Sequence, residues 1–170
     1  MANTYIQIGS TVTVGSGGAA TMAFSSIPAT YTDLILVYSG RTSEPTGTFY
    51  EVSLTLNGST TGFTAKQLYG DGSSASSSSP TSRQAGLIGN VATTSNTFSN
   101  TQVYFPNYAG SNNKSYSVDS VTENNSAASY VSMLAGLWSN SAAITSISIA
   151  PTSGNFVQYS TASLYGIKSS

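Results

Sequence analysis

The chain has 170 residues, of which only five are Lys or Arg and six are Asp or Glu, whereas 33 are Ser and 22 are Thr. This length predicts one domain whose core can form without a metal or a disulfide. His and Cys are both absent, which excludes a Ser-His-Asp triad, a cysteine nucleophile, a zinc site of the usual ligands and any disulfide.

Charge and hydropathy exclude two further classes of protein. A net charge of −1 provides no basic surface for nucleic acid. No apolar run approaches the roughly 20 residues that span a membrane, and residues 1–5 (MANTY) lack the basic and apolar parts of a secretory signal. We therefore expect a protein that is made in a cytoplasm and binds neither nucleic acid nor membrane.

Apolar and polar residues alternate along much of the chain, as in residues 50–56 (YEVSLTL), and this period of two is typical of half-buried strands. Residues 34–38 (LILVY) are continuously apolar, which is typical of a strand covered on both faces. In chain order, strands are predicted over residues 4–8, 11–14, 20–24, 32–39, 50–56, 63–69, 86–89, 101–105, 115–122, 129–138, 143–149 and 156–166.

No stretch of ten or more residues has helical periodicity, and turn sequences such as Asn57-Gly58 separate the predicted strands. Many short strands at this spacing predict an all-β fold, an antiparallel β-sandwich over residues 1–170. Long connections between some strands favour a jelly-roll within that class. Polar surface loops are predicted near 72–85 and 90–100.

The six carboxylates were considered as catalytic or metal-binding groups: Asp33, Glu44, Glu51, Asp71, Asp119 and Glu123. A glycosidase needs two facing carboxyl groups, and calcium needs several oxygen ligands from one dense loop. The spacing of these residues points to neither arrangement. We expect no enzyme, no cofactor and no metal, and a carbohydrate-degrading enzyme is kept only as a third alternative.

Aromatic residues provide the candidate contact site. Tyr104 and Tyr108 flank a Pro-Asn turn that contains Asn107. Tyrosine faces beside amide side chains can dock against sugar rings or flat protein partners. The alternative is that both tyrosines cover the edge of the core. Trp138 ends an apolar run and is predicted to be a core or subunit contact.

With the aliphatic residues assigned to the core, the predicted exterior consists of Ser, Thr, Asn and Gly and is nearly uncharged. Soluble monomers usually repel one another through dense surface charge, whereas the centres of specific interfaces are depleted of charge. The composition therefore favours a subunit of a repeated assembly.

Four segments resemble the small β-rich structural proteins of tailed bacteriophages, those of marine phages especially. They are residues 27–39 (IPATYTDLILVYS), 105–108 (FPNY), 137–149 (LWSNSAAITSISI) and 160–167 (STASLYGI). The resemblance extends through most of the chain and implies a β-sandwich of the virion, but it brings no catalytic residues with it.

The resemblance implies a virion protein, assembled in the cytoplasm of the host bacterium. The compact length of the chain suits a capsid decoration or cement protein or a head-appendage subunit. The expected partners are further copies of itself, as a homotrimer, and the major capsid protein or other virion proteins. The alternative is the receptor-binding tip of a tail fibre or appendage, with Tyr104, Asn107 and Tyr108 against a host surface glycan.

Overall fold

The computed structural model describes residues 4–80, 83–125 and 129–168, and within these it contains strands and turns but no helix. This confirms the predicted all-β class. The strands are β1 (Tyr5–Thr13), β2 (Met22–Phe24), β3 (Asp33–Thr42), β4 (Tyr50–Leu56), β5 (Phe63–Gly70), β6 (Ala75–Ser78), β7 (Gln84–Asn90), β8 (Ser99–Phe105), β9 (Lys114–Val121), β10 (Val131–Trp138), β11 (Ile147–Pro151) and β12 (Thr161–Ile167). In the described part of the chain, no helix is long and apolar enough to cross a membrane.

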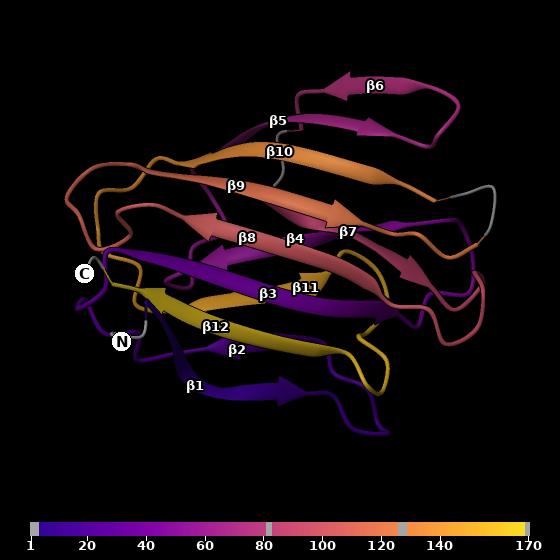
Figure 1. Cartoon of the computed structure of the whole chain (residues 1–170), viewed down its shortest axis with the longest axis horizontal. Coiled ribbons are helices and arrows are strands. Elements are labelled where there is room, and N and C mark those ends of the chain that lie inside the picture. Colours follow the sequence, from indigo (N-terminus) through magenta and orange to yellow (C-terminus); the bar gives the residue numbers. More distant parts are fainter. Residues whose placement is uncertain (1–3, 81–82, 126–128, 169–170) are drawn as a thin grey trace.

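The strands form one mixed sheet that consists of two antiparallel runs. The eight-strand run has the order β1-β12-β3-β8-β9-β10-β5-β6, and the four-strand run has the order β2-β11-β4-β7. A short parallel pairing of β3 with β7, at Arg41–Thr42 and Gly89–Asn90, joins the two runs. In Figure 1 the eight-strand run descends from β6 to β1, and the four-strand run lies behind it.

Residues 27–39 and 160–167, two of the segments singled out in the sequence, contribute neighbouring strands of the eight-strand run. Residues 34–37 of β3 pair antiparallel with residues 163–166 of β12, with Leu36 opposite Leu164. Both leucines are fully buried. The strong apolar patterning of these segments therefore follows from their place in the core.

Side chains of both runs meet in one core that includes Leu34 and Leu36 of β3, Leu54 of β4 and Ile149 of β11. Trp138 is 1% exposed and stacks on Phe63, with ring centroids 6.0 Å apart, so of its two predicted roles, core residue or subunit contact, the structure shows the first. Burying a side chain of this kind stabilises the fold by about 1.5–3 kcal/mol.

All seven residues of β7 are buried, and hydroxyl groups of the eight-strand run bind its backbone. The Ser120 hydroxyl accepts the Leu87 N–H at 2.9 Å and donates to the Leu87 carbonyl at 3.0 Å. Tyr38 donates to the carbonyl of Ala85. These bonds replace the ladder that a neighbouring strand would otherwise supply. The prediction of a hydroxyl-rich exterior is thus wrong for Ser120, which is a core residue.

The structure corrects the prediction of a polar loop over 72–85. Residues 75–78 form β6, which pairs with Gln67–Gly70 of β5, and residue 84 already belongs to β7. The side chains of β6 are all exposed, so backbone hydrogen bonds hold this strand without the apolar alternation by which strands are recognised. Residues 81–82 lie outside the described residues, and 91–98 connect β7 to β8.

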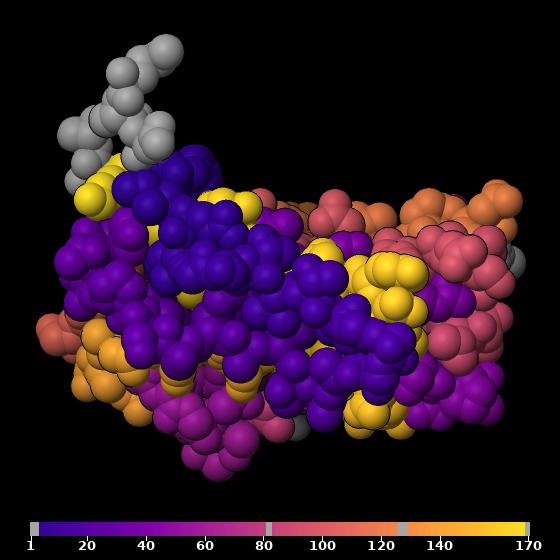
Figure 2. Space-filling model, turned by 90° about the horizontal axis from the view of Figure 1, so that it is seen from below, coloured from indigo at the N-terminus to yellow at the C-terminus, as the bar shows by residue number. Residues whose placement is uncertain are grey.

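The two predicted strands at 4–8 and 11–14 are one strand, β1. Its register against β12 shifts between Ile8 and Val12, where Gly9 has a φ of 70°. Figure 2, a view from below, shows the indigo N-terminal residues running diagonally across the visible face, beside yellow residues of the C-terminal part. A bulge on a terminal strand disfavours edge-to-edge pairing with another sheet.

Candidate binding face

The exposed side of the eight-strand run, termed the outer face, is an extended surface built from neighbouring strands. Cross-strand pairing sets its rows: Tyr165 lies opposite Ile35, and Ile35 lies opposite Tyr104. The row continues from Tyr104 through Ser117 and Ala135 to Lys66. Residues far apart in the sequence thus form one surface.

The structure places Tyr104 on this face and fixes its phenol group. The hydroxyl donates to Asp33 Oδ2 at 2.8 Å, and the backbone N–H of Asn107 donates to Asp33 Oδ1 at 2.8 Å. Because only the protonated phenol can donate this hydrogen bond to the carboxylate, Asp33 raises the pKa of Tyr104. Asp33 therefore joins the start of β3 to the turn that follows β8.

Tyr108 does not share the surface position that was predicted for it. Its side chain has no exposed area, and its hydroxyl donates to the carbonyl of Pro28. Asn107 is exposed, in a left-handed conformation with a φ of 46°. This conformation turns the chain inward after Asn107, so Tyr108 packs as a core residue and is not available to a ligand.

An apolar stripe, formed by Leu68, Val121, Val131 and Met133, crosses the outer face where β5, β9 and β10 lie side by side. Met133 is 61% exposed, Val131 56% and Leu68 54%. Met133 pairs with Leu68 of β5, and Val131 pairs with Val121 of β9. The stripe borders a shallow hollow of about 740 Å³, which Lys66 and Asp119 also line. Contiguous apolar groups exposed in this way are typical of an interaction surface.

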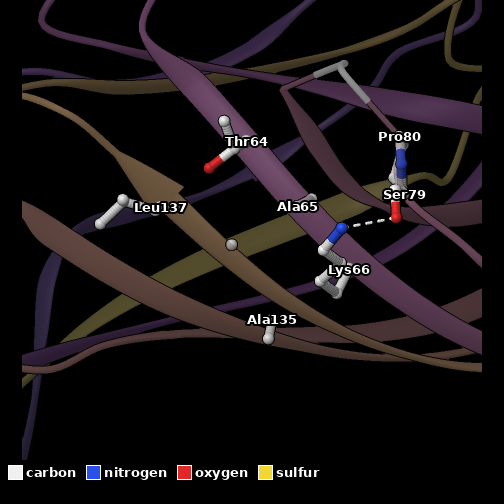
Figure 3. Close-up of a pocket in the computed structure, with 8 residues that line it drawn as sticks. Thr64, Ala65, Lys66, Ser79, Pro80, Ala135 and Leu137 are labelled. Atoms are coloured by element: carbon white, nitrogen blue, oxygen red, sulfur yellow. Dashed lines mark hydrogen bonds between the residues drawn. The ribbon is translucent and has the colours of Figure 1, made fainter.

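A second hollow, of about 420 Å³, adjoins the first around Lys66. Figure 3 shows Lys66 reaching from β5 to Ser79, with Thr64 and Leu137 further along the two strands. The Lys66 ammonium donates to the Ser79 hydroxyl at 2.6 Å. This contact ties the segment after β6 to the outer face.

Two of the carboxylates considered for metal binding, Asp71 and Glu123, serve turns, whereas Asp119 is an exposed residue within β9. Asp71 Oδ1 accepts the backbone N–H groups of Ser73 and Ser74 at 2.9 and 2.8 Å, and these bonds lower the pKa of Asp71 to about 2. Glu123 accepts the N–H of Asn125 at 2.7 Å. Among residues 4–80, 83–125 and 129–168, no three Asp or Glu side chains are grouped as metal ligands would be.

Two residues of the outer face, Tyr5 and Tyr165, were not predicted as contact residues. Together with Ile35, Val37 and Gln102 they line a hollow of about 480 Å³. The alternation in β12 carries the signal for Tyr165: Ala162 and Leu164 point to the core, which places Tyr165 on the opposite side.

Because of its buried tyrosines, the stability of the protein changes with pH in the alkaline range. Burial raises the pKa of Tyr38 and raises that of Tyr116 to about 12. In the unfolded chain tyrosine loses its proton near pH 10, so above that pH the native state binds more protons than the unfolded state. The stabilisation is complete below about pH 10 and is lost as pH rises through the native pKa values.

We therefore expect the free energy of unfolding, from urea titrations, to fall as pH rises from about 10 to about 12. Tyr116→Phe is the informative variant, because its hydroxyl is buried and finds no hydrogen-bond partner among the described residues. This variant should be at least as stable as the wild type at neutral pH and should lose less stability in alkali. A steeper alkaline loss in Tyr116→Phe would contradict this explanation.

The sequence matches no known protein-family model. A search of curated proteins likewise returned no relative. The candidate face is consequently interpreted from its own residues.

Proposed function

We propose that the chain is a structural subunit of a tailed-bacteriophage virion, a jelly-roll domain that decorates or cements the capsid or forms part of a head appendage. Its role is assembly through protein–protein contacts, as a homotrimer that also binds the major capsid protein or another virion protein. It carries out no reaction and needs no cofactor.

The pairing order supports the jelly-roll part of this proposal. The pairs β1–β12, β12–β3 and β3–β8 belong to one run, and β2–β11, β11–β4 and β4–β7 to the other. With β5, β6, β9 and β10 set aside, the chain alternates between the runs from β1 to β4 and again from β7 to β12, and strands from its two ends pair with each other. Two Greek keys of a jelly-roll have this pattern, which is common in viral capsid domains. Hairpins β5–β6 and β9–β10 extend one of its sheets.

The observation that carries the assembly role is the apolar stripe. Leu68, Val131 and Met133 are each more than half exposed on an extended strand surface, and of the described residues that line the adjoining hollow only Lys66 and Asp119 carry charge. Burying this area removes apolar groups from water at little cost in desolvated charge. The apolar stripe therefore suits a contact between two flat, weakly charged protein surfaces.

Light scattering during size-exclusion chromatography tests self-association. At micromolar concentration we expect a mass three times the 17.4 kDa of the chain. Met133→Asp should reduce it to that of a monomer, because the carboxylate would lose its hydration at the contact. Ser115→Asp, at an exposed position of the neighbouring strand β9, is the matched control and should remain trimeric. A wild-type monomer, or a trimeric Met133→Asp, would contradict the proposal.

A second candidate function is the receptor-binding tip of a tail fibre or tail appendage. The exposed Tyr5 and the partly exposed Tyr104 and Tyr165 of the outer face support it, since aromatic rings with polar tips suit a wet, sugar-binding surface.

A further inference from the structure

The outer face has a trough that runs over β3, between strands that stand on either side of it. Ile35 and Val37 of β3 provide an apolar floor, Tyr165 of β12 and Tyr5 of β1 stand on one side, and Gln102 of β8 stands on the other. Figure 1 shows β1, β12, β3 and β8 side by side across the sheet. The volume of about 480 Å³ lies within the range of small-molecule sites.

The side chains around the trough combine apolar surface with uncharged polar groups. Tyr5 is 57% exposed, Gln102 is exposed and Tyr165 is partly exposed. Tyrosine rings and an aliphatic floor offer apolar surface to the C–H groups of a pyranose ring, while the Gln102 amide and the phenol groups can bond to its hydroxyls. This is the chemistry that carbohydrate recognition requires.

A smaller hollow, distinct from the two around Lys66, continues the trough along β3 and β12. It measures about 240 Å³, and it shares Val37 and Tyr165 with the first. Its remaining lining includes the polar side chains Ser39, Asn100, Thr161 and Ser163. Tyr165 thus lies between an aromatic hollow and a hydroxyl-rich one, an arrangement with room for two successive sugar units.

Among the described residues, those that line the two hollows include none that is charged. An anionic sugar would lose hydration there without gaining an ionic partner, which disfavours it. The Asp33 carboxylate, beside Tyr104, accepts hydrogen bonds from Tyr104 and from the backbone of Asn107. The lining therefore favours uncharged sugars.

We propose that this trough binds a neutral oligosaccharide, with one pyranose ring against Tyr5 and Tyr165 and the next ring over Ser163 and Asn100. The inference rests on the second candidate function and names its site, which lies on the strands and not at the Asn107 turn. It does not depend on the apolar stripe.

A glycan array tests the ligand class. The probes are neutral oligosaccharides of glucose, galactose, mannose and N-acetylglucosamine, with sialylated oligosaccharides for comparison. We expect binding to at least one neutral series, tighter for a trisaccharide than for its monosaccharide. Absence of binding to every neutral probe at millimolar concentration would overturn the proposal, as would tighter binding of the sialylated probes.

Variants then locate the site by calorimetric titration of the best probe. Tyr165→Ala should weaken binding by about tenfold or more, because it removes the ring shared by both hollows. Tyr165→Phe should retain most of the affinity. The matched control is Tyr159→Ala, which removes a tyrosine that is 68% exposed and lines neither hollow. Equal affinity of Tyr165→Ala and the wild type would refute the assignment.

Gln102→Ala, which changes an exposed side chain, gives a second test if Tyr165→Ala does not fold. It should weaken binding about threefold or more through the lost amide hydrogen bonds, and unchanged affinity would count against the trough. Measuring the mass of the same samples separates the two proposals. A trimer that binds no sugar refutes the trough alone, and a monomer that binds refutes self-association alone.

Discussion

Gly86→Ala will lower the free energy of unfolding by about 2–4 kcal/mol, the sum of backbone strain and overpacking. Gly86 has a φ of 130°, a conformation that residues with a Cβ rarely adopt. A Cβ at this position would lie 2.8 Å from Thr101 Cγ2 and 2.9 Å from the Tyr38 hydroxyl oxygen. Neither neighbour can move freely, because both are buried between β7 and the eight-strand run.

Thermal unfolding followed by circular dichroism measures this effect, at about 2–4 °C of Tm for each kcal/mol in a chain of this size. Gly15→Ala is the matched control, since a Cβ there meets no atom within 4 Å. We expect the control to change stability by no more than about 0.5 kcal/mol. Equal melting temperatures for Gly86→Ala and Gly15→Ala would show that β7 is not held as described.

Ser120→Ala is expected to be almost as destabilising, by about 2–4 kcal/mol, because it leaves two buried backbone groups of Leu87 without their bonds. Ser120 gives its only proton to the Leu87 carbonyl. In the 2.9 Å contact between Thr101 and Ser120, Thr101 is therefore the donor. The substitution thus also removes the acceptor of the Thr101 hydroxyl.

Urea unfolding measures this loss, with Ser115→Ala as the control. Ser115 lies on the same strand but is exposed, so its substitution should be nearly neutral. If Ser120→Ala matched Ser115→Ala, the hydroxyl groups between β7 and β9 would contribute nothing to the fold.

Alternation of apolar residues predicted most strands closely. The prediction over 50–56 coincides with β4, and that over 63–69 differs from β5 by one residue. Such strands bury one face, so the sequence records their period directly. The polar strand β6 buries neither face, so its sequence has no apolar alternation by which it could be predicted. Which strands pair is set by contacts between distant segments, and local patterning does not contain that information.

The candidate site was predicted only in part. Tyr104 lies on the outer face, but Tyr108 is in the core, because the left-handed backbone of Asn107 reverses the direction of the next side chain. A local pattern cannot reveal that reversal. The apolar stripe was also missed: Val131 and Met133 belong to a run in which nearly every residue is apolar or small, so the sequence does not distinguish its exposed side.

Hydroxyl residues have two roles that composition alone could not separate. Ser120 and Ser99 bond to the backbone of β7 inside the molecule, whereas Ser163 and Ser39 line a hollow on the outer face. A serine is small enough to be buried when a backbone partner is present. The abundance of Ser and Thr therefore supports both the construction of the core and a weakly charged exterior.

The central proposal is that this chain is a part built into a virus particle. If the proposal holds, a phage encodes the chain, and immunogold electron microscopy of the purified particles of that phage is the most direct test, with an antibody raised against the purified chain. The proposal predicts gold at regular positions on the head shell or a head appendage of intact particles. Particles that carry no gold, with the protein recovered only from the lysate that surrounds them, would contradict it.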